Sequence, residues 1–424
     1  MDSPAPSMLS RLSRNTLILL FSNGITTGLA FLLTILIGRG LGDAGLGRYA
    51  AIMAWILPLT ILADFGISTL ITRDVAEDRS RTENYIRQAV RWRWLLGGGL
   101  VLGIWISAPW MASDPKIVVG LRIASFLVLI DAIFGVYTAV WRAWEIMWPI
   151  LVLNTGLLSL QVGGAALAVW QDWGLNGVLA AVVLADLVQL GATWLLWRWR
   201  FRPHLQGGTP APARFLKLAF PFAFGGLLAT LYARMIFLIL ETHTSAEVVG
   251  WFAAASRFIE AAKMPALALF GAIFPMMSAL LFEPAQLRNL LKKVTAGLVL
   301  YGLIGAIVLN LLSGFLLGFA FGSAFENAVP MLMLLGWSLI PSLLRQNLAV
   351  FHYALHREQQ VNRIVLAVLP VQLIAGTLLI EKWGGRGAAW TLLCTENLLM
   401  VFLWLSYRTM RDENWHSDTG ILRE

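Results

Sequence analysis

The sequence is almost without cysteine. Its 424 residues contain a single one, Cys394, in a stretch apolar enough to be a helix. One thiol excludes a disulfide framework and a cysteine-based metal cluster, and it carries no information about the redox compartment. No HExxH pattern is present either. The sequence therefore predicts neither a bound metal nor a cofactor.

Charged residues are also scarce. They make up 13% of the chain, against 58% apolar residues and a mean hydropathy of +0.72. This balance is typical of a polytopic membrane protein, in which each crossing needs about 20 mainly apolar residues. We predict an all-α fold, because open β-structure cannot survive in lipid and the apolar runs lack the alternation of a barrel. About twelve transmembrane helices are expected, centred near residues 27, 59, 103, 128, 159, 185, 228, 264, 306, 340, 371 and 397.

Long loops and catalytic motifs are lacking as well. The longest segments predicted to be non-helical are 73–93 and 198–217, and the outer loops have only about ten residues each. No Walker A, GxSxG or strand-linked GxGxxG motif occurs. These absences argue against a membrane enzyme, and without an ATPase motif the possible energy sources are an ion gradient or the gradient of a substrate.

Basic residues are unevenly distributed along the chain. With a cytoplasmic N-terminus, the inner segments hold 22 of the 32 Lys and Arg residues and the outer loops hold five. The positive-inside rule therefore predicts that both termini lie in the cytoplasm. The net charge of +8 is spread over seven inner segments with no stacking surface between them, which argues against a nucleic-acid partner.

A linker and an internal repeat divide the chain. Segment 201–217 contains GGTPAPA, and we predict that it separates an N-terminal six-helix lobe (1–200) from a C-terminal six-helix lobe with a short tail (218–424). AGLGRYAAIMAWI (44–56) aligns with EVVGWFAAASRFI (247–259) at an offset of 203 residues, unless generic helix-start residues match by chance. Six helices separate the equivalents, so the repeats are parallel and the lobes should face a central cavity.

Ten ionisable side chains fall inside the predicted helices. Each costs roughly 2.5–3.5 kcal/mol at the bilayer centre on insertion scales, so they need a shared explanation. A water-filled cavity between the lobes supplies one, because charges that face it need no solvation by lipid. The ten residues are Asp64, Arg122, Asp131, Asp186, Arg234, Arg257, Glu260, Lys263, Arg345 and Glu396.

Three of these charges, Arg257, Glu260 and Lys263, lie within seven positions of one helix. At about 100° per residue they share an arc of about 120°, so all three fit on one cavity-facing side. The alternative is a structural triad in which Glu260 neutralises its neighbours through i,i+3 pairs. The triad still keeps a charge of +1, and the helices of the second half have a positive surplus while those of the first half are acidic.

The other charges have two interpretations each. Asp131 and Asp186 are candidates for binding a coupling proton or sodium ion, or for pairing with Arg122 or across the lobes. Asp64 and Arg73 flank the end of a helix, which is more typical of residues that fix the turn into a loop. The candidates for coupling or cavity charges are Asp131, Asp186, Asp64, Glu260 and Glu396.

Several stretches resemble a known family. The first half contains the small-residue turn GRGLGDAGLGRYA (38–50), the tripeptide DFG (64–66) and Arg73 ahead of a basic loop; the second half contains KLAFPFAFGGLLATLYARMIFLIL and EVVGWFAAASRFIE. These features resemble bacterial oligosaccharide flippases, the polysaccharide transporter branch of the multidrug/oligosaccharidyl-lipid/polysaccharide superfamily. One departure is that Met and Ile follow Arg234, where such transporters often carry an acidic residue.

The resemblance implies a transporter rather than an enzyme. Such proteins move a lipid-linked sugar chain, typically on undecaprenyl pyrophosphate, from the cytoplasmic to the periplasmic leaflet of the bacterial inner membrane during surface polysaccharide (O-antigen) assembly. We expect Arg257, Lys263 and Arg234 to bind the diphosphate and Arg345 to help loading, in two lobes that alternate in access. The implied partners are the lipid-linked oligosaccharide, membrane lipids, a polysaccharide polymerase and the chain-length machinery.

Two other functional classes stay open. A cation-coupled drug antiporter of the same superfamily would favour an acidic cavity, which the three aspartates of the first half support. A membrane enzyme of polysaccharide assembly would need catalytic groups in its outer loops, and the sequence shows none.

Overall fold

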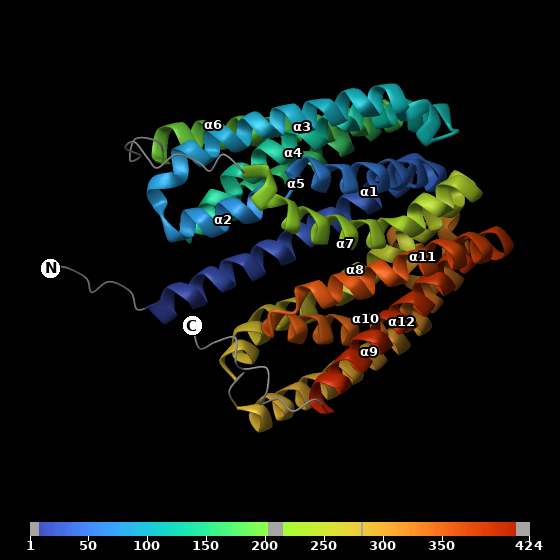
Figure 1. Cartoon of the computed structure of the whole chain (residues 1–424). Helices are drawn as coiled ribbons and strands as arrows, with labels where there is room; N and C mark the ends of the chain where they lie inside the picture. Colours follow the sequence, from blue (N-terminus) through green and yellow to red (C-terminus); the bar gives the residue numbers. More distant parts are fainter. Residues whose placement is uncertain (1–7, 202–214, 281–282, 413–424) are drawn as a thin grey trace. The chain divides into compact units, whose positions relative to one another are not determined.

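The computed structural model describes residues 8–201, 215–280 and 283–412 (Figure 1). Every regular element in these ranges is a helix, which confirms the all-α prediction. The chain forms two compact units, Met1–Ala253 and Ala254–Glu424, and each is described here by itself.

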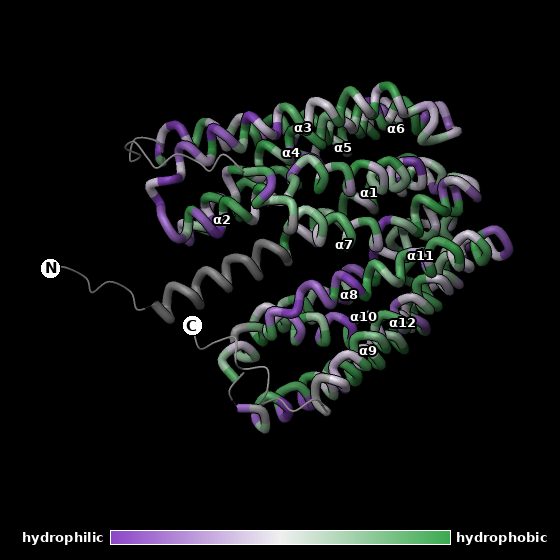
Figure 2. Tube along the Cα trace, viewed as in Figure 1, coloured by the Kyte–Doolittle hydropathy of each residue, from purple (hydrophilic) through white to green (hydrophobic). Residues whose placement is uncertain are grey.

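The number of membrane crossings agrees with the sequence. Within the described ranges, 11 helical segments are long and apolar enough to span a membrane. The first runs over 54 residues, Gly24–Glu77, and includes both of the crossings predicted near residues 27 and 59. These apolar runs are the long green stretches of the tube in Figure 2. The protein is a multi-pass membrane protein.

The first unit is a bundle built around its first helix. Its elements are α1 (Met8–Asp64), α2 (Ile67–Glu77), η1 (Arg79–Arg81), α3 (Thr82–Met111), α4 (Pro115–Ala143), α5 (Trp148–Trp170), α6 (Gly174–Leu196), the π-turn η2 (Trp197–Phe201) and α7 (Phe215–His243). Helix α1 packs on α4, α5 and α7, while α3 pairs with α4 and α5 with α6. Small and branched side chains such as Ala51, Ile52 and Ala124 fill the core between α1 and α4.

Two backbone breaks shape the first unit. Helix α1 is kinked at Gly42, whose φ of 72° lies in the left-handed region that favours glycine. A second break at Phe65 and Gly66, both with positive φ, turns the chain from α1 into α2. Gly66 also lies against α7, because a Cβ there would be 2.3 Å from the Ala219 carbonyl oxygen.

The second unit is centred on α10. Its elements are the larger part of α8 (Ala246–Ala279), α9 (Pro284–Phe321), η4 (Ser323–Ala328), α10 (Val329–Ala354), α11 (Glu358–Trp383) and α12 (Gly385–Asp412). Helix α10 packs on α9 and α12, and α12 also packs on α11. The core where α8, α9 and α10 meet contains Phe270, Leu298 and Leu343.

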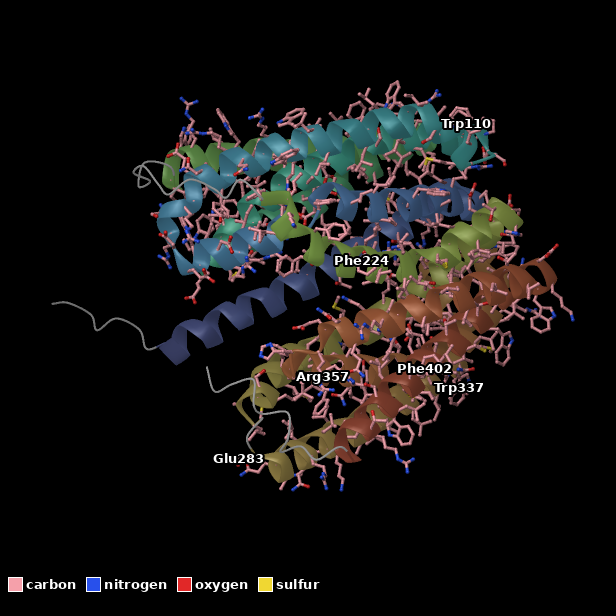
Figure 3. The ribbon with its side chains drawn as sticks, in the orientation of Figure 1. Trp110, Phe224, Glu283, Trp337, Arg357 and Phe402 are labelled. Carbon is pink, nitrogen blue, oxygen red and sulfur yellow. The ribbon has the colours of Figure 1, made fainter. Side chains whose placement is uncertain are left out.

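Large apolar side chains point outward from both units (Figure 3). Trp110 at the end of α3 is 80% exposed, and Trp337 on α10 and Phe402 on α12 are 42% and 37% exposed. Such surfaces are unfavourable in water but favourable against lipid tails and headgroups. Exposed apolar side chains of this kind suit contact with lipid.

One prediction about the loops is wrong. Segment 73–93 was expected to be non-helical, but α2 continues to Glu77 and α3 already begins at Thr82. Both helices extend beyond the apolar runs because their charged positions can face water while apolar ones such as Tyr85 and Ala89 stay buried. Most of the predicted linker 201–217 lies outside the described residues, and the lobe boundaries drawn from it stay a prediction.

Candidate functional site

Charged residues from α8, α10 and α12 pair inside the second unit. Arg257 and Glu260, one turn apart on α8, form an ion pair of 2.6 Å between Nη1 and Oε2. Arg345 of α10 donates from Nε to Oε2 of Glu396 on α12, also at 2.6 Å. The i,i+3 pair that the sequence suggested is therefore present, and its two side chains remain 32% and 44% exposed.

Lys263 connects these two ion pairs. It lies one turn beyond Glu260 on α8, is half-buried, and interacts electrostatically with Glu396, Arg345 and Glu260. Five predicted site residues therefore lie close enough to interact electrostatically, and Arg257 belongs to the group through its ion pair with Glu260. Three cations and two carboxylates leave the cluster with a net charge of +1. We call these five residues the α8 charge cluster.

Two aspartates form a second polar site, in the first unit. Asp131 of α4 and Asp186 of α6 are within hydrogen-bonding reach of each other. Gln161 of α5 donates to Oδ2 of Asp186 at 2.8 Å, and Asp186 is only 3% exposed. Two carboxyl groups this close repel unless a proton or a cation lies between them. Among the described residues, no group of three or more His, Cys, Asp or Glu is arranged to hold a metal ion.

Asp64 belongs to a third polar cluster, with a residue that the sequence interpretation missed. It forms an ion pair with Arg93 of α3, whose side chain is fully buried. The Arg93 guanidinium also donates to the Ala132 carbonyl oxygen and, at 2.8 Å, to Oγ of Ser68. The Ser68 hydroxyl in turn donates to Asp64 at 2.5 Å. A buried cation is thus surrounded by acceptors from three elements of the first unit.

Arg73, which the sequence analysis placed with Asp64 at a helix end, has a partner of its own. Arg73 pairs with Asp74, Nε to Oδ1 at 2.8 Å. Arg93 was missed because it was placed in a loop, yet a signal existed in the sequence. The buried face of α3 recurs every four residues through Tyr85, Ala89, Arg93, Gly97 and Val101, so Arg93 lies on the buried stripe of a helix.

Arg234 lies on α7 in the first unit, whereas the α8 charge cluster belongs to the second. A joint site of Arg234 with Arg257, Lys263 and Arg345 therefore stays a prediction.

No curated protein matches the chain significantly in sequence.

The fold defines a class of transporters. An inward-facing multidrug resistance MATE family transporter of the MOP superfamily superposes with a TM-score of 0.78 at 14% identity, over 92% of this chain and 96% of that chain. The lipid II flippase MurJ in an inward closed conformation gives 0.77 at 12% identity, over 92% and 87%. A MOP superfamily transporter from Pyrococcus furiosus Vc1 gives 0.68 at 13% identity, over 96% of both chains. These likenesses establish that the chain has the all-helical fold of MATE and MurJ, which is built of two lobes in those transporters.

The sequence then identifies the family within this class. The family described as polysaccharide biosynthesis protein matches residues 12–281, well over half of the chain. The chain belongs to this family, and its fold is the one seen in the MATE and MurJ transporters. The resemblance inferred from the motifs is thereby confirmed.

Proposed function

We propose that the protein is a flippase that moves an oligosaccharide linked to undecaprenyl diphosphate from the cytoplasmic to the periplasmic leaflet of the bacterial inner membrane. The observation that carries this proposal is the net positive α8 charge cluster within an apolar helical unit. A diphosphate is the part of such a cargo that needs cations most, because its negative charge has to leave water. Family membership supplies the link to polysaccharide biosynthesis.

The geometry of the α8 charge cluster suits reversible binding of an anion. Glu396 is 4% exposed and holds Arg345 in one orientation from the buried side. Glu260 is 44% exposed, so a phosphate oxygen can replace it on Arg257 without stranding a buried carboxylate. Lys263 adds a point charge, while the arginines offer forked donors. Bound cargo is therefore held by several cations, each with a carboxylate available again after release.

The other charged sites receive distinct roles in this proposal. Arg234 contributes to the diphosphate site from α7, and Arg345 assists loading. Asp131 and Asp186 take up a coupling proton or sodium ion, because their close approach inside the first unit favours a bound cation. Asp64 is held by Arg93 and acts as a cavity charge.

The proposed transport cycle is supported by the fold and by the lack of an ATPase motif in the sequence. The two lobes open in turn to the cytoplasm and the periplasm, both termini stay cytoplasmic, and the polyprenyl tail remains in lipid. A polysaccharide polymerase and the chain-length machinery receive the delivered glycan. No covalent bond of the cargo changes, so the protein acts as a transporter and not as an enzyme.

Reconstitution tests the proposal directly. Purified protein in liposomes should flip a glycan on a polyprenyl diphosphate carrier faster than the same glycan on a monophosphate carrier. Lys263→Ala should slow the diphosphate cargo about tenfold, as expected for the loss of one charge-assisted contact. Arg257→Lys should be milder than Arg257→Ala, and Arg87→Ala, at a 75% exposed position, should have no effect.

The opposite results have clear meanings. Equal rates for the two carriers, unaffected by Lys263→Ala, would contradict a diphosphate site in the α8 charge cluster. Uptake of organic cations coupled to the acidic pair Asp131 and Asp186, without any flipping, would instead establish the drug antiporter.

A further inference from the structure

A cavity of about 690 Å³ lies in the second unit, beside the turn that joins α10 to α11. Its polar part is lined by the basic side chains His356, Arg357 and Arg363 and by one acidic side chain, Glu358. Figure 3 labels Arg357 and a lining residue from α12, Phe402. Two arginines against one carboxylate give the polar part a net positive charge, and a protonated histidine adds to it. A site of this composition attracts an anion.

Arg363 has no carboxylate paired with it in the part of the chain that the structure describes. It is exposed, and none of the ion pairs formed there includes it. Arg257 and Arg345 of the α8 charge cluster differ in this respect, because each forms an ion pair with a glutamate. An anion that enters the cavity therefore meets the Arg363 guanidinium without displacing an acidic side chain from it.

The turn before α11 carries a histidine at a position that favours glycine. The His356 N–H donates to the Tyr353 carbonyl oxygen at 3.0 Å, and the Arg357 N–H donates to the His352 carbonyl oxygen at 2.9 Å. These are the two hydrogen bonds of a Schellman motif, in which the residue after the helix is usually glycine. Here it is His356, with a φ of 54° in the left-handed region. Because such a backbone costs stability for a side chain larger than glycine, a binding role for the imidazole explains its presence.

The rest of the lining is apolar and leads into the membrane-spanning part of α11. Ile364 and Ala367 of α11 line the cavity beside Phe402 of α12. Further exposed side chains, spaced by three or four residues, continue the same face of α11. They are Val371, Ile374 and Leu378. A cavity of this size, with an apolar strip running from it, matches a ligand with a negatively charged head and a hydrocarbon tail.

The cavity also lies at the level expected for a lipid headgroup. Helix α11 is long and apolar enough to span a membrane over Glu358–Trp383. Its charged residues are confined to the two ends, since no charged residue occurs between Arg363 and Glu381. The polar part of the cavity is therefore placed where the charged start of α11 meets its apolar run, which is the depth of the phosphates in a bilayer.

We propose that this cavity binds an anionic phospholipid, with the phosphate held by His356, Arg357 and Arg363 and one acyl chain lying along the apolar face of α11. The arginines supply forked donors for the phosphate oxygens. Bound lipid stabilises the folded second unit, because it binds the folded chain and not the unfolded one. The site belongs entirely to the second unit, and it does not depend on which cargo the protein moves.

Lipid binding to the full-length protein in detergent tests the site. Native mass spectrometry should show phosphatidylglycerol binding at least about tenfold more tightly than zwitterionic phosphatidylcholine. Arg363→Gln should weaken phosphatidylglycerol about tenfold, as expected for one charge-assisted contact, and adding Arg357→Gln should abolish the preference. Arg288→Gln is the matched control, because this exposed arginine of α9 does not line the cavity and should leave binding unchanged. Equal affinity for the two lipids, or an unchanged preference in the double variant, refutes the proposal.

His356→Gly separates a binding role from a structural one. Glycine relieves the left-handed backbone, so the unfolding temperature of the lipid-free protein should rise by about 1–2 °C. Phosphatidylglycerol should nevertheless bind several-fold more weakly, because the imidazole is gone. A more stable protein that binds less lipid is not explained by misfolding. Unchanged affinity for phosphatidylglycerol would remove His356 from the site and overturn the reasoning from the strained turn.

Soluble phosphates and a polyprenyl diphosphate distinguish the sources of the anion. Glycerol 3-phosphate and inorganic phosphate carry the charge without a tail, so they should not raise the unfolding temperature at concentrations where phosphatidylglycerol raises it by several degrees. Equal stabilisation by the soluble phosphates would make this a site for free phosphate and refute the lipid. Preferential binding of the polyprenyl diphosphate, lost in the double arginine variant, would assign the cavity to cargo and likewise overturn the proposal.

Discussion

The ion pair of Arg93 with Asp64 offers the sharpest test of how the first unit is held together. Arg93 is fully buried and Asp64 is 24% exposed. Asp64→Asn removes the negative charge but keeps the shape of the side chain, so the Arg93 cation is left with only neutral acceptors, Ser68 and the Ala132 carbonyl. Arg93→Met removes the cation and leaves Asp64, the more exposed residue of the pair, without its partner.

The expected loss of stability differs between the two substitutions. Breaking a buried ion pair from one side costs about 3–5 kcal/mol, because the remaining charge is uncompensated. Asp64→Asn should cost about 3 kcal/mol, at the low end of this range, since neutral acceptors remain around Arg93. Arg93→Met should lower the free energy of unfolding by less than this, because water can reach the Asp64 carboxylate that remains. The double variant Arg93→Met with Asp64→Leu should recover most of the loss, since apolar replacement of a buried pair is often neutral.

The assay is unfolding in mixed detergent micelles, followed by the fluorescence of the nineteen tryptophans. The control is Glu83→Gln, which breaks the exposed i,i+4 pair with Arg87 and should change stability by about 0.5 kcal/mol or less. A loss below about 1 kcal/mol for Asp64→Asn would refute the buried-charge reasoning. If such a stable variant also fails to transport, Asp64 acts as a coupling charge rather than as a structural one.

Three further predictions concern packing, pH and coupling. Gly135→Ala should destabilise the protein by about 1–3 kcal/mol, because the new Cβ would lie 2.9 Å from Nη1 of Arg93. Gly98→Ala is the control: its Cβ would have open space around it, so this substitution should stabilise the protein by up to about 1 kcal/mol in the same unfolding assay. Burial raises the pKa of Asp114, but its hydrogen bonds outweigh this effect and hold the pKa below the usual 3.8. The ionised carboxylate should therefore stabilise the fold above about pH 4, and this stabilisation should be lost at lower pH in the native protein but not in Asp114→Asn. Asp186→Asn should make the rate of flipping in liposomes independent of an imposed pH or sodium gradient, and a rate that still responds to the gradient would exclude the acidic pair as the coupling site.

Much of the fold could be predicted from the sequence because the membrane imposes it. Apolar runs of about 20 residues can only be helices in lipid, so their number and order follow from composition. The limits of helices could not be read in the same way. Around 73–93 the apolar signal ends while the helices continue into water, and hydropathy alone does not show where α2 stops and α3 starts.

The candidate site was predicted in part. The i,i+3 spacing of Arg257 and Glu260 indicated their pairing, since a helix fixes such neighbours. The partnership of Arg345 with Glu396, 51 residues apart, depends on which faces of α10 and α12 meet, and one sequence without homologues does not show this. Arg93 was predictable in principle, because its buried stripe on α3 repeats every four residues.

Gly47 and Gly250 show how the sequence and the structure complement each other. The repeat that aligns Gly47 with Gly250 is weak as a sequence match, because it consists of common residues. In the structure, a Cβ on Gly47 would lie 1.7 Å from the Ala246 carbonyl oxygen and a Cβ on Gly250 would lie 2.0 Å from that of Asp43, so the two aligned segments touch each other at equivalent positions.

The central claim is best tested by asking which leaflet holds the lipid-linked glycan in cells that lack the protein. A membrane-impermeant sugar label reports the glycan on the outer side, before and after complementation with the wild type, with Lys263→Ala and with the exposed control Arg87→Ala. We predict accumulation on the cytoplasmic side that the wild type and Arg87→Ala correct and Lys263→Ala does not. Normal export of the glycan in the deletion strain would contradict the flippase.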